Sequence, residues 1–170
     1  AQTWIKVASE RQFNEDLEWL IDVKSIVKNG GWIYVSNCET AKGGASALSF
    51  DSRSNILGSY SICEKTRRNC AGGKTPWGTW ITCEEVEDGF AWECDPLGEK
   101  KQIKISNLGM FNHEAAAVHK QTSIIYLTED AKDGGFFRFV PNKKIKQMGD
   151  LSKSKGVFQV MKIKDKKVVW

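Results

Sequence analysis

Short runs of β-branched and aromatic residues, separated by turn-forming residues, repeat along the chain from residue 32 to its end. Such runs are typical of strands, and clusters of Gly, Pro, Asn and Asp between them are typical of turns. The predicted strands are residues 32–36, 45–50, 56–62, 77–83, 90–94, 102–105, 115–119, 124–128, 136–140, 157–163 and 166–169. This alternation predicts an all-β fold.

One segment with helical periodicity precedes these strands. Apolar residues recur at a spacing of three to four across residues 11–28, and Asn29-Gly30-Gly31 follows as a stop signal. We therefore expect a short N-terminal helix within an extension that covers residues 1–30.

A strand that runs into a turn recurs at a regular interval, at Asp51, Asp95 and Pro141. The intervals are 44 and 46 residues, and the blades of β-propellers repeat at roughly 40–50 residues. Eleven predicted strands, at about four to a blade, amount to about two to three blades, which is too few to close a ring. The sequence therefore predicts a partial β-propeller whose ring is completed by something else, or a different small sandwich or barrel.

The net charge of +4 is unevenly distributed over the 170 residues. Residues 142–170 carry nine lysines against two aspartates, a local charge of +7, which leaves −3 for residues 1–141. A surface that binds nucleic acid is expected to combine lysine with arginine and aromatic residues, so no nucleic-acid partner is predicted. The lysines are expected to form the solvated face of strands, with peripheral contact to an acidic protein or a membrane surface as the alternative. No apolar run approaches eighteen residues, so no transmembrane span is expected.

Residues 67–85 hold the densest group of chemically active side chains. Arg67 and Arg68 suit bidentate contacts to phosphate or carboxylate. Cys70 supplies a thiol, and the glycine pair at 72–73 would let a tight turn approach a ligand. A P-loop is excluded, because the first glycine of that motif would fall at position 68. Two adjacent carboxylates follow at Glu84 and Glu85. Because side chains alternate between the two faces of a strand, at most one of them is expected to face a site.

Three other segments place oxygen or nitrogen ligands beside predicted strands. They are His113-Glu114, the run Glu129-Asp130 before Gly134-Gly135, and the pair Asn37 and Glu39. Carboxylate and amide oxygens suit hard cations such as calcium. Taken singly, each group is better explained as a solvated strand end, a turn cap or a loop hydrogen bond. Their co-occurrence in one short chain shifts the balance towards a multi-metal site, which stands beside that interpretation.

The five cysteines are an odd number without a C-x-x-C pair, so a structural zinc knuckle is not predicted: Cys38, Cys63, Cys70, Cys83 and Cys94. A disulfide framework would leave one thiol over. Either most of these residues are small buried hydrophobes, or one is held free for a metal or for chemistry.

The order of these motifs resembles the PhoX alkaline phosphatase family. The resemblance rests on residues 69–85 (NCAGGKTPWGTWITCEE), with supporting matches at 31–37 (GWIYVSN), 43–48 (GGASAL), 113–118 (HEAAAV) and 126–130 (YLTED). It covers about residues 31–141, which are expected to form the propeller blades, with residues 142–170 as a lysine-rich β tail of the same domain.

The resemblance implies an exported phosphomonoesterase that holds iron and calcium in the centre of a propeller. By the same resemblance Cys70 is the iron-binding thiolate. The carboxylate candidates are Glu84 or Glu85, Glu114 and Glu129, with Asn37 and Glu39 as weaker ligands, while Arg67 or Arg68 assists the phosphate.

Members of the family are much longer than this chain, and three hypotheses follow from that. The chain is a fragment or short relative of a PhoX-like phosphatase, active when the remaining blades are supplied. Alternatively, it is a non-catalytic structural or interaction subunit of a larger assembly, for instance in an organelle. A third hypothesis is a small domain that binds calcium or a phosphorylated ligand without turnover.

Overall fold

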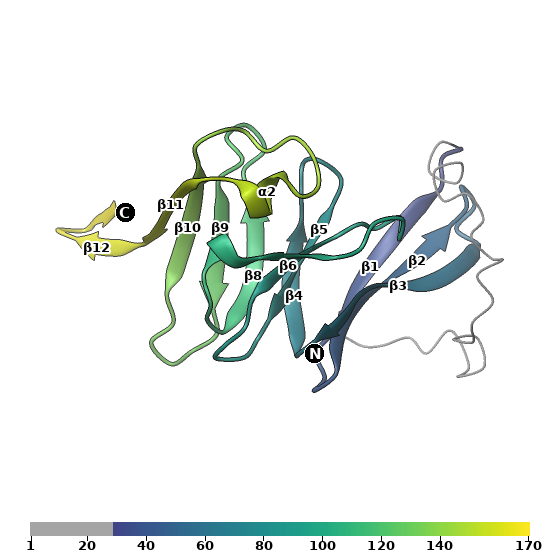
Figure 1. Cartoon of the computed structure of the whole chain (residues 1–170), viewed down its shortest axis with the longest axis horizontal. Coiled ribbons are helices and arrows are strands. Elements are labelled where there is room, and N and C mark those ends of the chain that lie inside the picture. The colour runs from purple at the N-terminus through teal and green to yellow at the C-terminus, as the bar shows by residue number, and fades with distance from the viewer. Residues whose placement is uncertain (1–28) are drawn as a thin grey trace.

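The computed structural model describes residues 29–170, and these residues form three antiparallel sheets, a small hairpin and two short helical turns (Figure 1). The N-terminal helix predicted at 11–28 lies outside the described residues. No helix within 29–170 is long and apolar enough to cross a membrane.

The first sheet contains three strands in the order β1-β2-β3. Its strands are β1 (Trp32–Cys38), β2 (Gly43–Phe50) and β3 (Ile56–Thr66). β2 pairs with both neighbours, and its register with β3 shifts between Gly43 and Ser46 and again near Phe50. Bulges of this kind increase the local twist of a sheet.

The second sheet has the order β4-β5-β6-β7. Its strands are β4 (Asn69–Lys74), β5 (Trp80–Glu84), β6 (Ala91–Cys94) and β7 (Ile103–Ile105). The predicted tight turn at the glycine pair is wrong, because Gly72 and Gly73 lie inside β4. The strand predicted at 77–83 begins only at Trp80, since residues 75–79 form the turn that joins β4 to β5.

The third sheet has the order β8-β9-β10-β11. Its strands are β8 (His113–Val118), β9 (Ile125–Glu129), β10 (Phe136–Pro141) and β11 (Gly156–Val160). The 3-10 turn η3 (Ser106–Leu108) precedes β8, and the short helix α2 (Asp150–Lys153) precedes β11. β12 (Lys162–Lys164) and β13 (Lys167–Val169) form a separate hairpin beyond β11, where the sequence pattern predicted longer strands.

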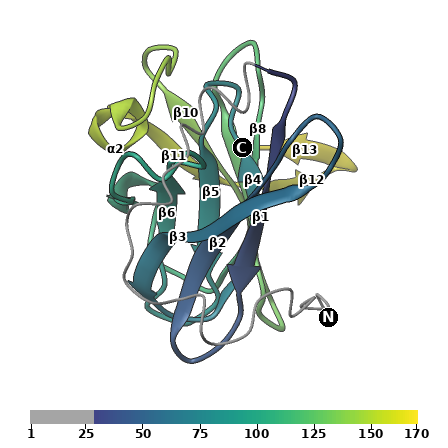
Figure 2. The same cartoon turned by 90° about the vertical axis from the view of Figure 1, so that its right-hand side faces the viewer.

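The three sheets follow one another in space, and their first strands, β1, β4 and β8, lie next to each other (Figures 1 and 2). Each junction between consecutive sheets has its own hydrophobic core. Residues such as Ala45, Ala47 and Cys94 fill the junction of the first two sheets. Ile81, Leu127 and other residues fill that of the second and third. Sheets stacked face to face around a row of first strands are the arrangement expected of successive propeller blades.

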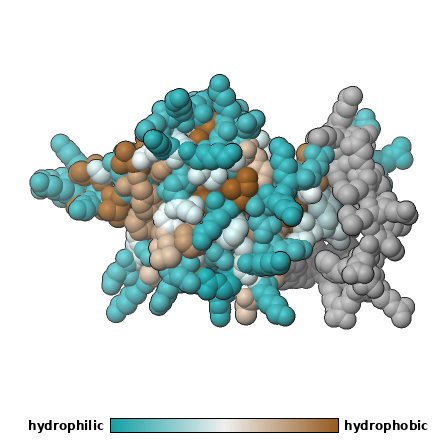
Figure 3. All heavy atoms as spheres, in the orientation of Figure 1, coloured by the Kyte–Doolittle hydropathy of each residue, from teal (hydrophilic) through white to brown (hydrophobic). Residues whose placement is uncertain are grey.

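The C-terminal end of the molecule exposes apolar side chains. Figure 3 shows hydrophobic residues gathered where β11 runs into β12. Ile163 of β12 is 74% exposed. These strands carry lysines between the apolar residues, so both kinds of side chain reach the surface here.

Candidate metal centre

Five side chains from all three sheets converge on one end of the row formed by β1, β4 and β8. They are Glu39 directly after β1, Cys70 in β4, Glu85 directly after β5, Glu114 in β8 and Asp130 directly after β9. The ligand atoms of Glu39, Cys70 and Glu85 all lie within 4.8 Å of one another, and so do those of Glu85, Glu114 and Asp130. We call these five residues the acid–thiol cluster.

The electrostatics of the acid–thiol cluster are those of a site that lacks positive charge. The Cys70 Sγ donates a hydrogen bond to Glu114 Oε1 at 3.6 Å. Burial, together with Glu85, Glu114 and Glu39, raises the pKa of the Cys70 thiol far above its usual range. Burial also raises the pKa of Glu85, and its neighbours Asp130, Glu39 and Glu114 add to that shift. A cation among these groups would reverse both effects, because it favours their charged forms.

The donor set fits a metal on chemical grounds. Four carboxylates offer the hard oxygen atoms that calcium and ferric iron accept, and a thiolate is a soft ligand that suits iron. Glu85 belongs to both three-residue groups, so it would be a ligand of an ion held by either group.

Backbone contacts of Arg68 fasten two of these ligands. Its N–H donates to Thr40 O at 2.8 Å, next to Glu39, and its carbonyl accepts from Glu85 N–H at 2.9 Å. The residue has a φ of 42°, in the left-handed region that residues other than glycine adopt at a cost in free energy. Arg68 therefore orients the loops of Glu39 and Glu85 through its main chain, while its side chain is exposed.

Asn37 lies beside the cluster, but its side chain is already saturated by the protein. Its Nδ2 donates to Ala71 O at 2.8 Å and to Cys70 O at 3.3 Å. Its Oδ1 accepts from Trp80 Nε1 at 3.0 Å and from Thr82 Oγ1 at 2.9 Å. Asn37 thus fixes the backbone of Cys70 instead of offering an oxygen to a metal.

The glycine pair in β4 serves packing. A Cβ on Gly72 would collide with the carbonyl of Ile81 in β5, and one on Gly73 with the carbonyl of Ala116 in β8. The two glycines therefore let β4 approach its neighbours on both sides. This close approach brings Cys70 of β4 to Glu114 of β8.

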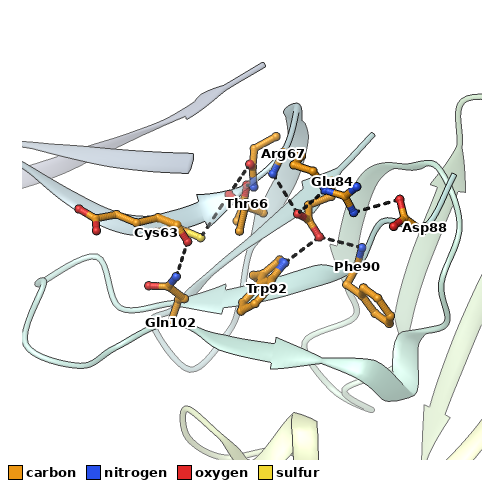
Figure 4. A network of polar contacts seen from close by, with 11 residues as sticks. Cys63, Thr66, Arg67, Glu84, Asp88, Phe90, Trp92 and Gln102 are labelled. Atoms are coloured by element: carbon orange, nitrogen blue, oxygen red, sulfur yellow. Dashed lines mark hydrogen bonds and ion pairs between the residues drawn. The ribbon is translucent and has the colours of Figure 1, made fainter. Parts of the chain in front are cut away.

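The structure holds Glu84 outside the acid–thiol cluster. The Glu84 side chain is buried, and its oxygens accept three hydrogen bonds, from Arg67 N–H at 2.9 Å, Phe90 N–H at 3.1 Å and Trp92 Nε1 at 3.0 Å (Figure 4). Arg67 in turn directs its guanidinium to Asp88 Oδ1, 3.0 Å away. Glu84 does not fit as a ligand, since its oxygens are engaged within the protein. The half-exposed Arg67 guanidinium is paired with Asp88, outside the acid–thiol cluster.

At the end of β9 the residue that reaches the cluster is Asp130, whereas sequence reasoning selected Glu129. Glu129 Oε2 accepts from Gly135 N–H at 2.8 Å and stabilises the turn to β10. Glu129 is paired in register with His113, and the residue that follows each of them in the chain, Asp130 or Glu114, belongs to the cluster. The signal that could have found Asp130 is this alternation, which sends neighbouring residues to opposite faces.

His113 points away from the cluster. Its ring stacks on Phe111 with centroids 3.6 Å apart, and its Nε2 lies 3.3 Å from Gly109 O. Burial lowers the pKa of His113 to about 4. The imidazole is therefore a neutral core group, and Glu114 alone of this pair faces the site.

Comparisons with known proteins agree with the fold. The family described as Alkaline phosphatase PhoX matches residues 43–170. One solved structure, Pseudomonas fluorescens PhoX in complex with vanadate, a transition state analogue, superposes with a TM-score of 0.65 at 16% identity. The match covers 81% of this chain and 44% of that one. None of the curated proteins matches. The predicted all-β fold, a partial β-propeller, is thereby confirmed.

Proposed function

The chain belongs to the PhoX alkaline phosphatase family, and on that premise we propose that it forms part of a metal-dependent phosphomonoesterase. The observation that carries the proposal is the acid–thiol cluster, in which four carboxylates and one thiol from three successive sheets meet. Burial and the neighbouring acids raise the pKa of Cys70 and of Glu85 in this cluster, and a cation would offset that cost.

The proposed metals are iron at Cys70 and calcium among the carboxylates. Cys70 would hold iron as a thiolate, while Glu39, Glu85, Glu114 and Asp130 would supply oxygen ligands. When bound, these cations would neutralise the phosphate of a monoester and help to generate the attacking oxygen.

The chain's own residues would hold and orient this site. Asn37 fixes the main chain of Cys70, and Arg68 fixes the loops of Glu39 and Glu85. The exposed Arg68 guanidinium is the remaining candidate for a contact to the substrate phosphate, because Arg67 is paired with Asp88. Export from the cell and the division into residues 1–30, 31–141 and 142–170 also remain parts of the proposal.

A second candidate function is a non-catalytic subunit of a larger assembly, including one in an organelle. One observation favours it. Apolar residues of β11 to β13 are exposed, and a further blade or a partner protein could pack on them. The chain spans 44% of the solved PhoX chain that it matches.

The decisive experiment measures metal content and hydrolysis of p-nitrophenyl phosphate together. We expect the purified chain to retain iron and calcium, and Cys70→Ser to lose the iron. Cys38→Ser is the matched control, because Cys38 is also half-buried and its thiol lies 3.3 Å from the Thr40 hydroxyl and does not belong to the acid–thiol cluster. Metal retention with hydrolysis supports the enzyme, and metal retention without it supports a binding domain or a fragment that needs further blades. A wild-type chain that binds no metal would refute the phosphatase proposal.

A further inference from the structure

Two cysteines from different sheets meet inside the core between the first and second sheets. Cys63 lies in β3 and Cys94 at the end of β6, and their exposed fractions are 2% and 0%. Both belong to the same hydrophobic cluster as Ala45 and Ala47. The packing of one sheet on the other therefore brings together two cysteines that are far apart in sequence.

The two thiols also affect each other. β3 and β6 are in contact at this core, and the interaction with Cys94 lowers the pKa of Cys63. The same contact, followed by burial, raises the pKa of Cys94 well above its usual range. Cys63 is consequently the better nucleophile of the pair, because the thiolate is the form that attacks a disulfide.

We propose that Cys63 and Cys94 form a disulfide bond that joins the first sheet to the second when the chain folds in the presence of a disulfide oxidant. The Cys63 sulfur attacks the oxidant, such as glutathione disulfide, and releases one equivalent of its thiol. The Cys94 sulfur then displaces the second equivalent from the mixed disulfide. Two protons and two electrons pass from the cysteines to the oxidant, so the step balances.

The other three cysteines have different surroundings. Cys70 is part of the acid–thiol cluster, and Cys83 lies in the core between the second and third sheets. Cys38 contacts the Thr40 hydroxyl at 3.3 Å. Among residues 29–170 the fold thus selects one pair for oxidation, and it leaves Cys70 available as a ligand.

This disulfide would act on the geometry of the metal centre without being part of it. Within the acid–thiol cluster, Glu39 is the residue that comes from the first sheet, while Cys70 and Glu85 come from the second. A covalent bond between those sheets would limit how far Glu39 can move from the other two. The inference rests on the core contact and does not depend on the proposed phosphatase activity.

The test counts thiols and maps the bond. The full chain is denatured and reduced, then refolded with a mixture of reduced and oxidised glutathione, and then denatured and alkylated. We expect three alkylated cysteines instead of five, and a mass two hydrogens lower before alkylation. Digestion with trypsin and glutamyl endopeptidase separates Cys83 from Cys94, so the linked peptides identify the pair.

Variants and stability complete the test. Cys94→Ala is expected to return the number of alkylated thiols to four, whereas the matched control Cys83→Ala keeps the bond and leaves two. The bond would close a loop of about 30 residues, so the oxidised protein should melt about 10 °C above the reduced one. Five alkylated cysteines after oxidative refolding, or a bond mapped to any other pair, would overturn the proposal.

Discussion

Carboxylates in this protein occur in two kinds of surroundings, and the contrast shows how a ligand is told from a structural carboxylate. Glu93 is fully buried, and its oxygens accept from Trp77 Nε1 at 2.6 Å, Thr79 Oγ1 at 2.8 Å and Gly149 N–H at 2.9 Å. Glu84 likewise accepts three hydrogen bonds from the protein. We call Glu84 and Glu93 the saturated acids.

The acid–thiol cluster is the opposite case. The groups with the largest effects on Cys70 and Glu85, apart from burial, are acids of the same cluster and each other. A saturated carboxylate already has its full set of donors, so a metal would have to displace them. A carboxylate that faces other acids gains from a cation at no such loss. Proximity to a motif therefore does not identify a ligand, whereas the state of its hydrogen bonds does.

The largest expected effect tests the saturated acids. Glu93→Ala leaves the Trp77 indole, the Thr79 hydroxyl and the Gly149 amide without their acceptor inside the core. We expect a loss of about 3–5 kcal/mol in the free energy of unfolding, measured by urea denaturation. Glu64→Ala, at an exposed position, is the control. A loss below about 1 kcal/mol at Glu93 would mean that its hydrogen bonds do not hold the fold.

Removal of metal tests the acid–thiol cluster. Ions that bind the native state stabilise it, by about 2.7 kcal/mol when their concentration is 100 times the dissociation constant. A chelator should therefore lower the melting temperature of the metal-loaded wild type. The same chelator should have a smaller effect on Cys70→Ser, which is expected to lose the iron, and on Glu85→Gln, which is expected to bind metal less tightly. An identical decrease in wild type and variants would contradict a metal at this place.

Glu84 and Glu85 are adjacent in the chain, so the same substitution at each compares a saturated acid directly with an acid of the cluster. Glu84→Gln replaces an accepting oxygen with a donor that faces other donors, so we expect it to cost about 2 kcal/mol of stability and to keep the metal. Glu85→Gln should lower metal affinity at least about tenfold. In the metal-free state it should not destabilise the protein, since it relieves repulsion between acids. Urea denaturation measures the stability of both variants, and metal titration measures their affinity. Loss of metal in Glu84→Gln alone would mean that Glu84, and not Glu85, is the ligand.

The smallest expected effect concerns a satisfied polar contact between the first two sheets. Tyr60 Oη donates to Pro96 O at 2.7 Å, and burial raises the pKa of Tyr60 to about 12. Because this pKa is raised above its unfolded value near 10, its contribution is complete below pH 10 and is lost as the pH rises towards 12. Tyr60→Phe should cost about 1 kcal/mol at neutral pH and show a weaker loss of stability between pH 10 and 12. Urea denaturation at several pH values in this range measures the free energy of unfolding of both proteins. The same dependence of that free energy on pH in wild type and variant would contradict the prediction.

The strand-and-turn pattern of the sequence was enough to predict most of the sheets, because alternation and turn chemistry are local. β4 was missed, since glycine is uncommon in strands and a Gly-Gly pair normally indicates a turn. The reason for those glycines lies in other parts of the chain, namely the carbonyls of Ile81 and Ala116 that approach them. A sequence read segment by segment does not contain that information.

For the candidate site, too, some features follow from the local sequence and others from the tertiary structure. Strand periodicity limited the pair Glu84 and Glu85 to one residue that faces a site, because the period of two is a property of the backbone. In the structure Glu84 is engaged within the protein and Glu85 belongs to the acid–thiol cluster. The sequence also identified the order of motifs that indicates the PhoX family. The tertiary structure decided which acid of each pair turns towards Cys70, that Asn37 and Arg67 are engaged within the protein, and that Cys63 meets Cys94. These outcomes depend on which groups from distant segments lie next to each side chain in the folded protein. The packing of one sheet against the next brings those groups into place.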